Sequence, residues 1–373
     1  MYVENGKISD RQTFRLFVFD LLGIGTLLLP PYLAKLTGVD GIFAILLGGI
    51  GGYLYLRYLG FIIGTIKTDA GSYLQEHSPK WVQWISFGYL SLHSILTAGF
   101  CAYVFTNLMQ HSLIRKESFV VILLVTMLLS AYAIGGGIES RARVYEVLFW
   151  FIFIPYVFMM LFSIRDVKME YFSSFFDTTG SNFTKGTYLV FLLLTPLFFS
   201  IFLLEKRNTS SEKFGSGMIK IVSKSLLFSV VVFLGSYIIL LGCFGEQGLS
   251  AMRYPVITLM STVQFRGSFL KRMDALMLGV WFFTLFALIN LHLHYGVEMM
   301  NKIKTSGRMW QIGIATMLVY ITAYVMEQSD GFVNVFLKYY SYVAVPIMIL
   351  GPLLLLWANP HAKRENMKNR GMP

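Results

Sequence analysis

Long apolar stretches alternate with short polar segments along nearly the whole chain. Each stretch lasts about 20 residues without the alternating apolar–polar pattern of a barrel strand, which is typical of a membrane-spanning α-helix. The predicted spans are residues 14–34, 41–65, 81–109, 119–138, 144–164, 187–204, 218–241, 276–298, 310–326 and 333–357. We therefore predict an all-α integral membrane protein with about ten transmembrane helices and both termini on one side.

The composition agrees with a chain that is surrounded largely by lipid. Hydrophobic residues make up 55% of the sequence and charged residues 14%, whereas a soluble domain carries roughly 25% charged residues. The net charge of +11 does not indicate nucleic-acid binding, because the lysines and arginines are spread between the spans without a basic groove of stacking aromatics.

The positions of lysine and arginine predict the orientation. Twenty of the 31 lie on the side that holds the termini, including the basic tail at residues 358–373. The positive-inside rule places that side in the cytoplasm, so we expect a multi-pass protein of the inner (plasma) membrane. On the opposite side, apolar and polar residues alternate at helical spacing over residues 254–265, which predicts a short amphipathic helix along the outer surface.

Two predicted spans carry helix-breaking residues in their middle. The first contains Gly23, Gly25 and Thr26, and the sixth contains Thr195 and Pro196. Interrupted helices in corresponding positions of two halves are typical of transporters built as inverted repeats. We therefore predict a five-plus-five inverted repeat within a single domain, with repeats at residues 12–164 and 187–357.

Unwinding at the first break has two interpretations. It exposes backbone groups at membrane depth, where the start of the outer half-helix favours an anion such as a carboxylate. The glycines are equally suited to let a neighbouring helix pack closely. The second interrupted helix favours the binding-site interpretation.

Asp20 lies just before the first break, and an intramembrane carboxylate is costly enough to be a candidate functional group. It is suited to receive a substrate ammonium group or a coupling proton. The alternative is a structural carboxylate that is hydrated or paired with a basic residue.

Other polar and small residues carry weaker signals. Thr97, Cys101 and Thr284 are suited either to line a cavity beside the broken helices or to form hydrogen bonds within the bundle. Gly48 and Gly52 indicate close helix packing rather than a phosphate loop. The sequence offers no cofactor or metal motif and no recognisable catalytic nucleophile, so we do not expect an enzyme; His292 and His294 are two apart on a helix and face different directions.

Several motifs together resemble the spore germination permease family, the B subunit of nutrient-germinant receptors, within the amino acid–polyamine–organocation transporter superfamily. They occur in the family's order from residue 7 to residue 357. The motifs are Lys7-Ile8-Ser9-Asp10-Arg11-Gln12, Leu22-Gly23-Ile24-Gly25, Leu29-Pro30, Gly135-Gly136-Gly137-Ile138-Glu139-Ser140-Arg141, Tyr254-Pro255 and Phe269-Leu270-Lys271-Arg272-Met273-Asp274 with Trp281.

The resemblance implies a ten-helix amino acid permease-like fold in the inner membrane of the spore. It further implies a receptor that senses an amino acid-like nutrient together with an A subunit and a lipoprotein C subunit. Its pocket would include Gly23, Gly25 and Thr26, with residues 195–200 opposite. The chain departs from the family at Phe199-Ser200, where relatives often carry glycine and an acidic residue, and at Asp20.

Two other functions remain open at this stage. A secondary active amino-acid transporter of the plasma membrane would use the same fold with Asp20 for coupling. A subunit that has lost its ligand is the third possibility, because the bulky Phe198-Phe199 pair lies where the pocket is expected.

Overall fold

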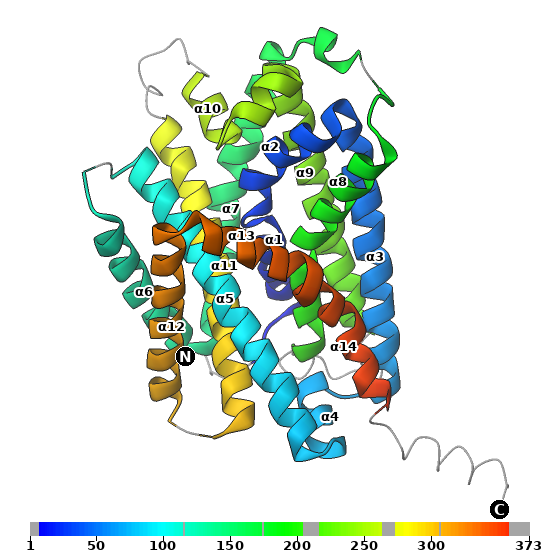
Figure 1. The fold of residues 1–373 in the computed structure, drawn as a ribbon, viewed down its shortest axis with the longest axis vertical. Helices are drawn as coiled ribbons and strands as arrows, with labels where there is room; N and C mark the ends of the chain where they lie inside the picture. Colours follow the sequence, from blue (N-terminus) through cyan, green and yellow to red (C-terminus); the bar gives the residue numbers. More distant parts are fainter. Residues whose placement is uncertain are drawn as a thin grey trace, which may run out of the picture.

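Among the described residues, ten helical segments, some of them interrupted, follow one another in the order of the predicted spans (Figure 1). The computed structural model describes residues 7–114, 116–173, 175–203, 216–262, 273–305 and 307–357, and within these ranges it contains no β-strand. Seven of its helical stretches are by themselves long and apolar enough to cross a membrane, and one of them, Gly25–Ile66, contains a turn at Gly38. The predicted all-α membrane fold is confirmed.

The crossings correspond to the predicted spans. They are α1 (Asp10–Leu22) with α2 (Gly25–Thr37), α3 (Gly41–Ile66), α5 (Lys80–Ser112), α6 (Phe119–Gly135), α7 (Gly137–Ser163), α8 (Gly180–Leu193) with η4 (Thr195–Phe202), α9 (Ser216–Ala251), α11 (Met273–Ile303), α12 (Arg308–Gln328), and α13 (Asp330–Tyr339) with η5 (Tyr340–Ala344) and α14 (Val345–Trp357). The connecting elements are η1 (Gly38–Asp40), α4 (Ala70–His77), η2 (Ile164–Asp166), η3 (Met169–Phe172) and α10 (Pro255–Thr262).

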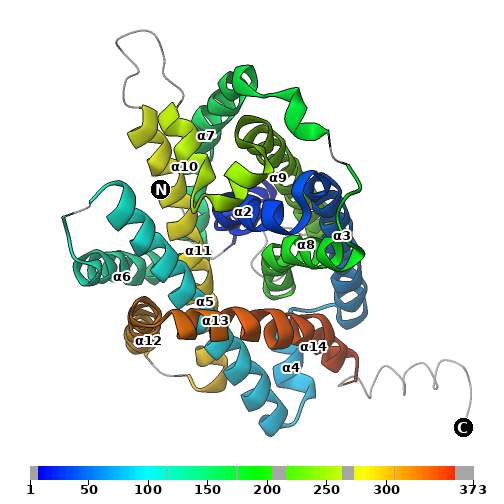
Figure 2. The same ribbon diagram turned by 45° about the horizontal axis from the view of Figure 1, so that its top comes forward.

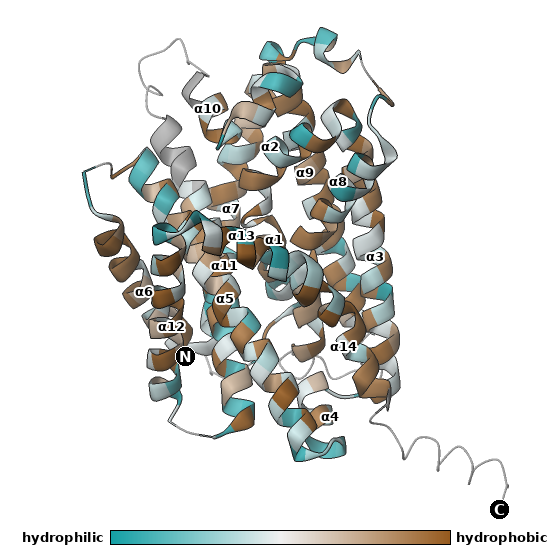
Figure 3. Cartoon of the chain, viewed as in Figure 1, coloured by the Kyte–Doolittle hydropathy of each residue, from teal (hydrophilic) through white to brown (hydrophobic). Residues whose placement is uncertain are grey.

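Polar caps determine where several helices begin. The Ser9 hydroxyl accepts a hydrogen bond from the Gln12 N–H, and the Gln12 side chain accepts one from the Ser9 N–H, which forms a capping box at the start of α1. Asp69 caps α4 through the Gly71 N–H at 3.0 Å, and Ser118 caps α6. Between the caps the helix surfaces are largely hydrophobic, with polar residues gathered at their ends (Figure 3).

The helices form two groups that meet at the two broken crossings. One group contains α1, α2, α3, α8, η4 and α9, and the other contains α5, α6, α11 and α12. The crossing made by α13, η5 and α14 runs over both groups and reaches α3 (Figure 2). Residues 23, 24 and 194 interrupt the helices close to where the groups meet.

Small residues allow the close packing within the first group. A Cβ atom on Gly48 would lie 2.6 Å from Val190, and one on Gly52 would lie 2.7 Å from Leu194. Both glycines therefore bring α3 against α8 and its continuation, which confirms that this pair serves helix packing.

Several helix boundaries differ from the predictions, and α9 extends furthest, to Ala251 rather than residue 241. α7 begins at Gly137 rather than near residue 144, because its polar first turns are stabilised by ion pairs that include Arg143 with Glu139. The tenth crossing begins at Asp330 and contains a π-helical turn at η5 that the sequence analysis did not predict. The amphipathic helix predicted at residues 254–265 is present as α10, and residues 263–265 lie outside the described residues.

Candidate functional site

The first interrupted crossing is broken by Gly23 and Ile24, as the sequence predicts. The N–H of Gly23 still bonds the Phe19 carbonyl at 3.1 Å, and α2 then starts at Gly25 without any side-chain hydrogen bond from its N-cap residue. Thr26 donates to the Leu22 carbonyl across the break and accepts a hydrogen bond from the Trp281 indole at 3.2 Å. The start of α2 therefore has no side-chain acceptor of its own near its backbone N–H groups.

The second interrupted crossing changes from an α-helix to a 3₁₀ helix at Thr195-Pro196. The Thr195 hydroxyl returns to the Leu192 carbonyl at 2.8 Å, and all eight residues of η4 are buried. The Ser200 hydroxyl has no hydrogen-bond partner among the described residues. The predicted break is confirmed, and it leaves one polar atom in the core without a partner.

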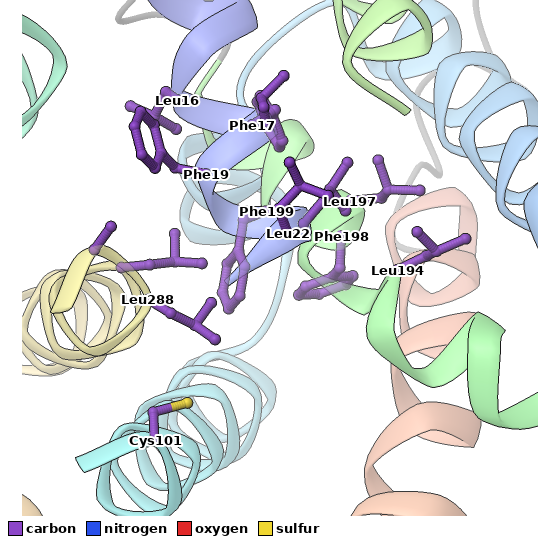
Figure 4. Close-up of a cluster of buried hydrophobic side chains, with 14 of the residues drawn as sticks. Leu16, Phe17, Phe19, Leu22, Cys101, Leu194, Leu197, Phe198, Phe199 and Leu288 are labelled. Carbon is purple, nitrogen blue, oxygen red and sulfur yellow. The ribbon is translucent and has the colours of Figure 1, made fainter. Parts of the chain in front are cut away.

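Apolar side chains fill the space between the two breaks. Figure 4 shows Leu22 of α1, Phe199 of η4, Leu288 of α11 and Cys101 of α5 converging there. A Cβ on Gly25 would lie 2.5 Å from the Phe233 ring, and one on Gly23 would lie 3.0 Å from Leu288. At these positions the described side chains that fill the junction are apolar and closely packed.

Phe199 lies in an aromatic stack at the second break. Its ring lies parallel to that of Tyr295, with the ring centroids 4.1 Å apart, and meets His292 edge-on at 5.6 Å. The Tyr295 hydroxyl is buried without a hydrogen-bond partner among the described residues. The polar atoms of His292 and Tyr295 therefore lie where α11 borders the apolar junction.

Asp20 forms a buried ion pair with Arg141 of α7. The side chains of Asp20 and Arg141 are 1% and 5% exposed. Arg141 also donates through Nε to the Tyr145 hydroxyl at 3.0 Å, and Tyr145 donates to the Ala287 carbonyl at 3.0 Å. This chain of contacts joins α1, α7 and α11, and it matches the paired alternative that the sequence left open for Asp20.

The predicted spans end at residue 138 and resume at residue 144, which leaves Arg141 in a loop, and this prediction is wrong. The helix starts earlier than predicted, so Arg141 lies more than one turn inside α7 and is buried. The signal was available, because the three glycines at residues 135–137 end one helix and start the next. A carboxylate at membrane depth also requires a buried partner.

The tenth crossing contributes further residues near the second break. Tyr340, in the π-helical turn η5, shares a hydrogen bond with Thr195 at the second break. His93 of α5 lies beside it, with its Nδ1 3.3 Å from the Tyr339 hydroxyl. Pro346 follows this turn and lacks an N–H, which is the one sequence signal for a disturbed helix there.

The other predicted site residues lie close to the junction but form local bonds. Thr97 donates to the His93 carbonyl at 2.8 Å, and Thr284 donates to the Trp281 carbonyl at 3.2 Å. Cys101 is a buried free thiol. Within the described ranges, no three histidine, cysteine or carboxylate side chains are placed to hold a metal ion.

A cavity opens at the end of the molecule that contains α10. It has a volume of about 320 Å³ and is lined by Lys35 of α2, Tyr103 and Asn107 of α5, and Arg253 and Tyr254 before α10. Asn107 also donates to the Glu327 carboxylate at 3.0 Å. Both cations and a carboxylate therefore lie at this cavity.

Comparisons with known proteins agree with this architecture. A family model described as spore germination protein matches residues 7–355. Spore germination protein B2 of Bacillus subtilis (strain 168) is 22% identical over 373 residues, which cover 97% of this chain and 98% of that protein. Spore germination protein KB of the same organism is 22% identical, with 99% of each chain covered.

Two solved transporter structures share the fold. A substrate-bound, outward-open Na⁺-coupled sialic acid symporter aligns with a TM-score of 0.65 at 14% identity, over 90% of this chain and 77% of its own. Mhp1, a nucleobase-cation-symport-1 family transporter with bound bromovinylhydantoin, aligns with a TM-score of 0.67 at 12% identity, over 92% of this chain and 77% of its own. These likenesses confirm the predicted transporter-type fold with two interrupted helices.

Proposed function

Since the chain belongs to the spore germination permease family, we propose that it is the membrane-embedded B subunit of a nutrient-germinant receptor, working with A and C subunits. Its relatives are spore germination proteins along essentially their full length. The family is one of membrane permeases rather than enzymes. The proposed place of action is the inner membrane of the spore, with both termini in the cytoplasm, which the excess of lysine and arginine on that side supports.

The closed apolar junction between the two broken helices carries this proposal. A transporter fold in which Phe233, Phe199 and Leu288 fill the space beside the breaks is suited to detect a small ligand that displaces them. Such a ligand shifts the equilibrium between closed and open junctions only if it binds the open one more tightly. The partner subunits would respond to that shift.

The proposed ligand is a small amino acid-like nutrient with an apolar side chain. Its carboxylate would face the start of α2, at Gly23, Gly25 and Thr26, where no side chain caps the helix. Its apolar part would displace side chains around Phe199. The proposed contacts further include Thr195, Pro196 and Ser200 of the second break, and Thr97, Cys101, Thr284 and Asp20 at its border.

The test is nutrient-triggered germination of spores that lack this protein and are complemented with wild type or Gly25→Leu. The added side chain would collide with the Phe233 ring, so we expect loss of the response to one nutrient. Gly235→Leu is the matched control, because a Cβ at that membrane glycine meets nothing within 4 Å. The amounts of this protein and of its partner subunits are measured in each strain.

A normal response with Gly25→Leu would remove the first break from the site.

The second candidate function is a secondary active amino-acid transporter, which the solved transporters of the same fold favour. Normal germination of the deletion strain with every nutrient, together with loss of uptake of one solute in growing cells, would identify the protein as that transporter. The buried pairing of Asp20 with Arg141 argues against Asp20 as a coupling group, because its charge is already neutralised.

A further inference from the structure

A long groove runs between α3 and α9 on the outward face of the first helix group. Its volume is about 1160 Å³, and exposed hydrophobic side chains form much of its wall. Phe61 of α3 and Leu227 of α9 are each 66% exposed beside it. This surface is separate from the junction between the broken helices.

Glycines account for the depth of the groove. Gly49, Gly60 and Gly64 lie along its α3 side, where larger residues would fill it. A Cβ on Gly60 would lie 2.9 Å from Ile219, so α9 approaches α3 closely at that level. A Cβ on Gly64 would meet nothing within 4 Å, so the groove is open beside it.

Three cations lie close together along the groove, around the level of Arg57. Arg57 of α3 and Lys220 and Lys224 of α9 all line it and are all exposed. The helices are antiparallel, and the contacts of Gly60 with Ile219 and of Gly52 with Leu226 place Arg57 between residues 219 and 226. No acidic residue is among the described residues that line the groove.

We propose that this groove binds an anionic phospholipid, with its phosphate between Arg57, Lys220 and Lys224 and an acyl chain along the apolar wall. Arg57 lies nine residues before the end of α3, and Lys220 and Lys224 lie four and eight residues after the start of α9. Their side chains would extend from there toward the headgroups on the side of the termini. Long basic side chains extend from an apolar helix surface to that level. An uncharged or zwitterionic lipid would pack against the same apolar wall but would leave the three cations without a net negative partner.

The three positive charges determine how strongly the groove should prefer anionic over zwitterionic lipid. Each lysine or arginine near a membrane surface strengthens attachment to anionic lipid roughly fivefold, so three of them favour it over zwitterionic lipid on the order of 100-fold. This preference for anionic lipid is electrostatic and therefore weakens with added salt.

The experiment is thermal unfolding of the purified full-length protein in detergent, with phosphatidylglycerol, cardiolipin or phosphatidylcholine added. We expect the two anionic lipids to raise the melting temperature by several degrees more than phosphatidylcholine. The triple variant R57Q/K220Q/K224Q should lose this difference. The triple variant K67N/K80Q/K304Q removes the same charge from exposed positions outside the groove and should keep it.

A second variant tests the apolar part of the groove without changing any charge. Ile50→Trp adds a larger side chain to the apolar wall, on the side of Arg57 away from the end of α3, and should weaken the stabilisation by anionic lipid. Equal shifts with phosphatidylcholine, or unchanged shifts with anionic lipid in Ile50→Trp, would overturn the proposal. An equal shift with sn-glycerol 3-phosphate alone would also overturn it, by identifying a site for soluble anions.

A photo-crosslinking residue at Tyr53, which lines the groove, distinguishes lipid from protein as the occupant in native membranes. Crosslinking to phospholipid supports the proposal. Exclusive crosslinking to another polypeptide would show that a partner helix occupies the groove and would overturn it.

Discussion

The two broken crossings are interrupted by different chemistry. In the first, Gly23 and Ile24 separate α1 from α2, and the half before the break is joined to α7 by the buried pair of Asp20 and Arg141. In the second, Thr195 and Pro196 start a 3₁₀ helix that is almost entirely apolar and buried. The hydrogen bond between the Thr195 hydroxyl and the Tyr340 hydroxyl joins this helix to the tenth crossing.

The difference indicates which half of the junction moves. A buried ion pair with additional hydrogen bonds through Tyr145 holds α1 in one place, because separating its partners exposes a charge to a low-dielectric interior. Side-chain packing holds η4, and packing is readily rearranged when a ligand offers equivalent apolar contact. We therefore expect η4, rather than α1, to change conformation on ligand binding.

Arg141→Met should have the largest effect on stability. It leaves the Asp20 carboxylate buried without its partner, at a cost of about 3–5 kcal/mol in the free energy of unfolding. The measurement is a denaturant titration of the purified protein, with Arg143→Met as the control. Arg143 also pairs with a carboxylate, but its side chain is 40% exposed, so its loss should cost about 1 kcal/mol or less.

The double variant D20N/R141M should recover part of the lost stability, because no charge is then left unpaired. Equal losses of unfolding free energy in Arg141→Met and Arg143→Met would contradict the rigid attachment of α1 and remove the contrast between the two breaks.

Gly25→Ala should have an intermediate effect. The new Cβ lies 2.5 Å from the Phe233 ring, so the ring must shift, at a cost of about 1–3 kcal/mol. Phe233→Leu in the same chain should restore stability by making room. Gly235→Ala is the control and should be neutral or stabilising, because alanine favours the helix and nothing lies nearby. A loss that Phe233→Leu does not relieve would show that the break requires glycine for its backbone conformation instead.

The fold was largely predictable from the sequence, because apolar length and helix-breaking residues are local signals. The spans and the breaks at Gly23-Ile24 and Thr195-Pro196 needed only those signals. The contacts of the site were harder to predict, since they join residues far apart in the chain. Nothing near Asp20 in the sequence indicates Arg141, which lies 121 residues away, or the Thr195 partner Tyr340, which lies 145 residues away.

The closed state of the junction was only partly predictable. The sequence showed the bulky Phe198-Phe199 pair, and the structure adds Phe233 from α9 and Tyr295 from α11. Which side chains fill a junction depends on how helices from both repeats approach one another. Composition and periodicity do not contain that information.

Tyr340→Phe should have the smallest effect of the three. It removes the hydrogen bond to Thr195 but keeps the aromatic ring, so we expect a loss of about 1 kcal/mol in the free energy of unfolding. Thr195→Val should cost more, because it also removes the hydrogen bond to the Leu192 carbonyl. The double variant should cost little more than Thr195→Val alone, since both changes remove the bond between Thr195 and Tyr340. Tyr342→Phe, in the same π-helical turn but 77% exposed, is the control and should change nothing. A loss from Tyr340→Phe as large as that from Arg141→Met would mean that η4 is held as rigidly as α1, and the expected difference in mobility between the two breaks would be wrong.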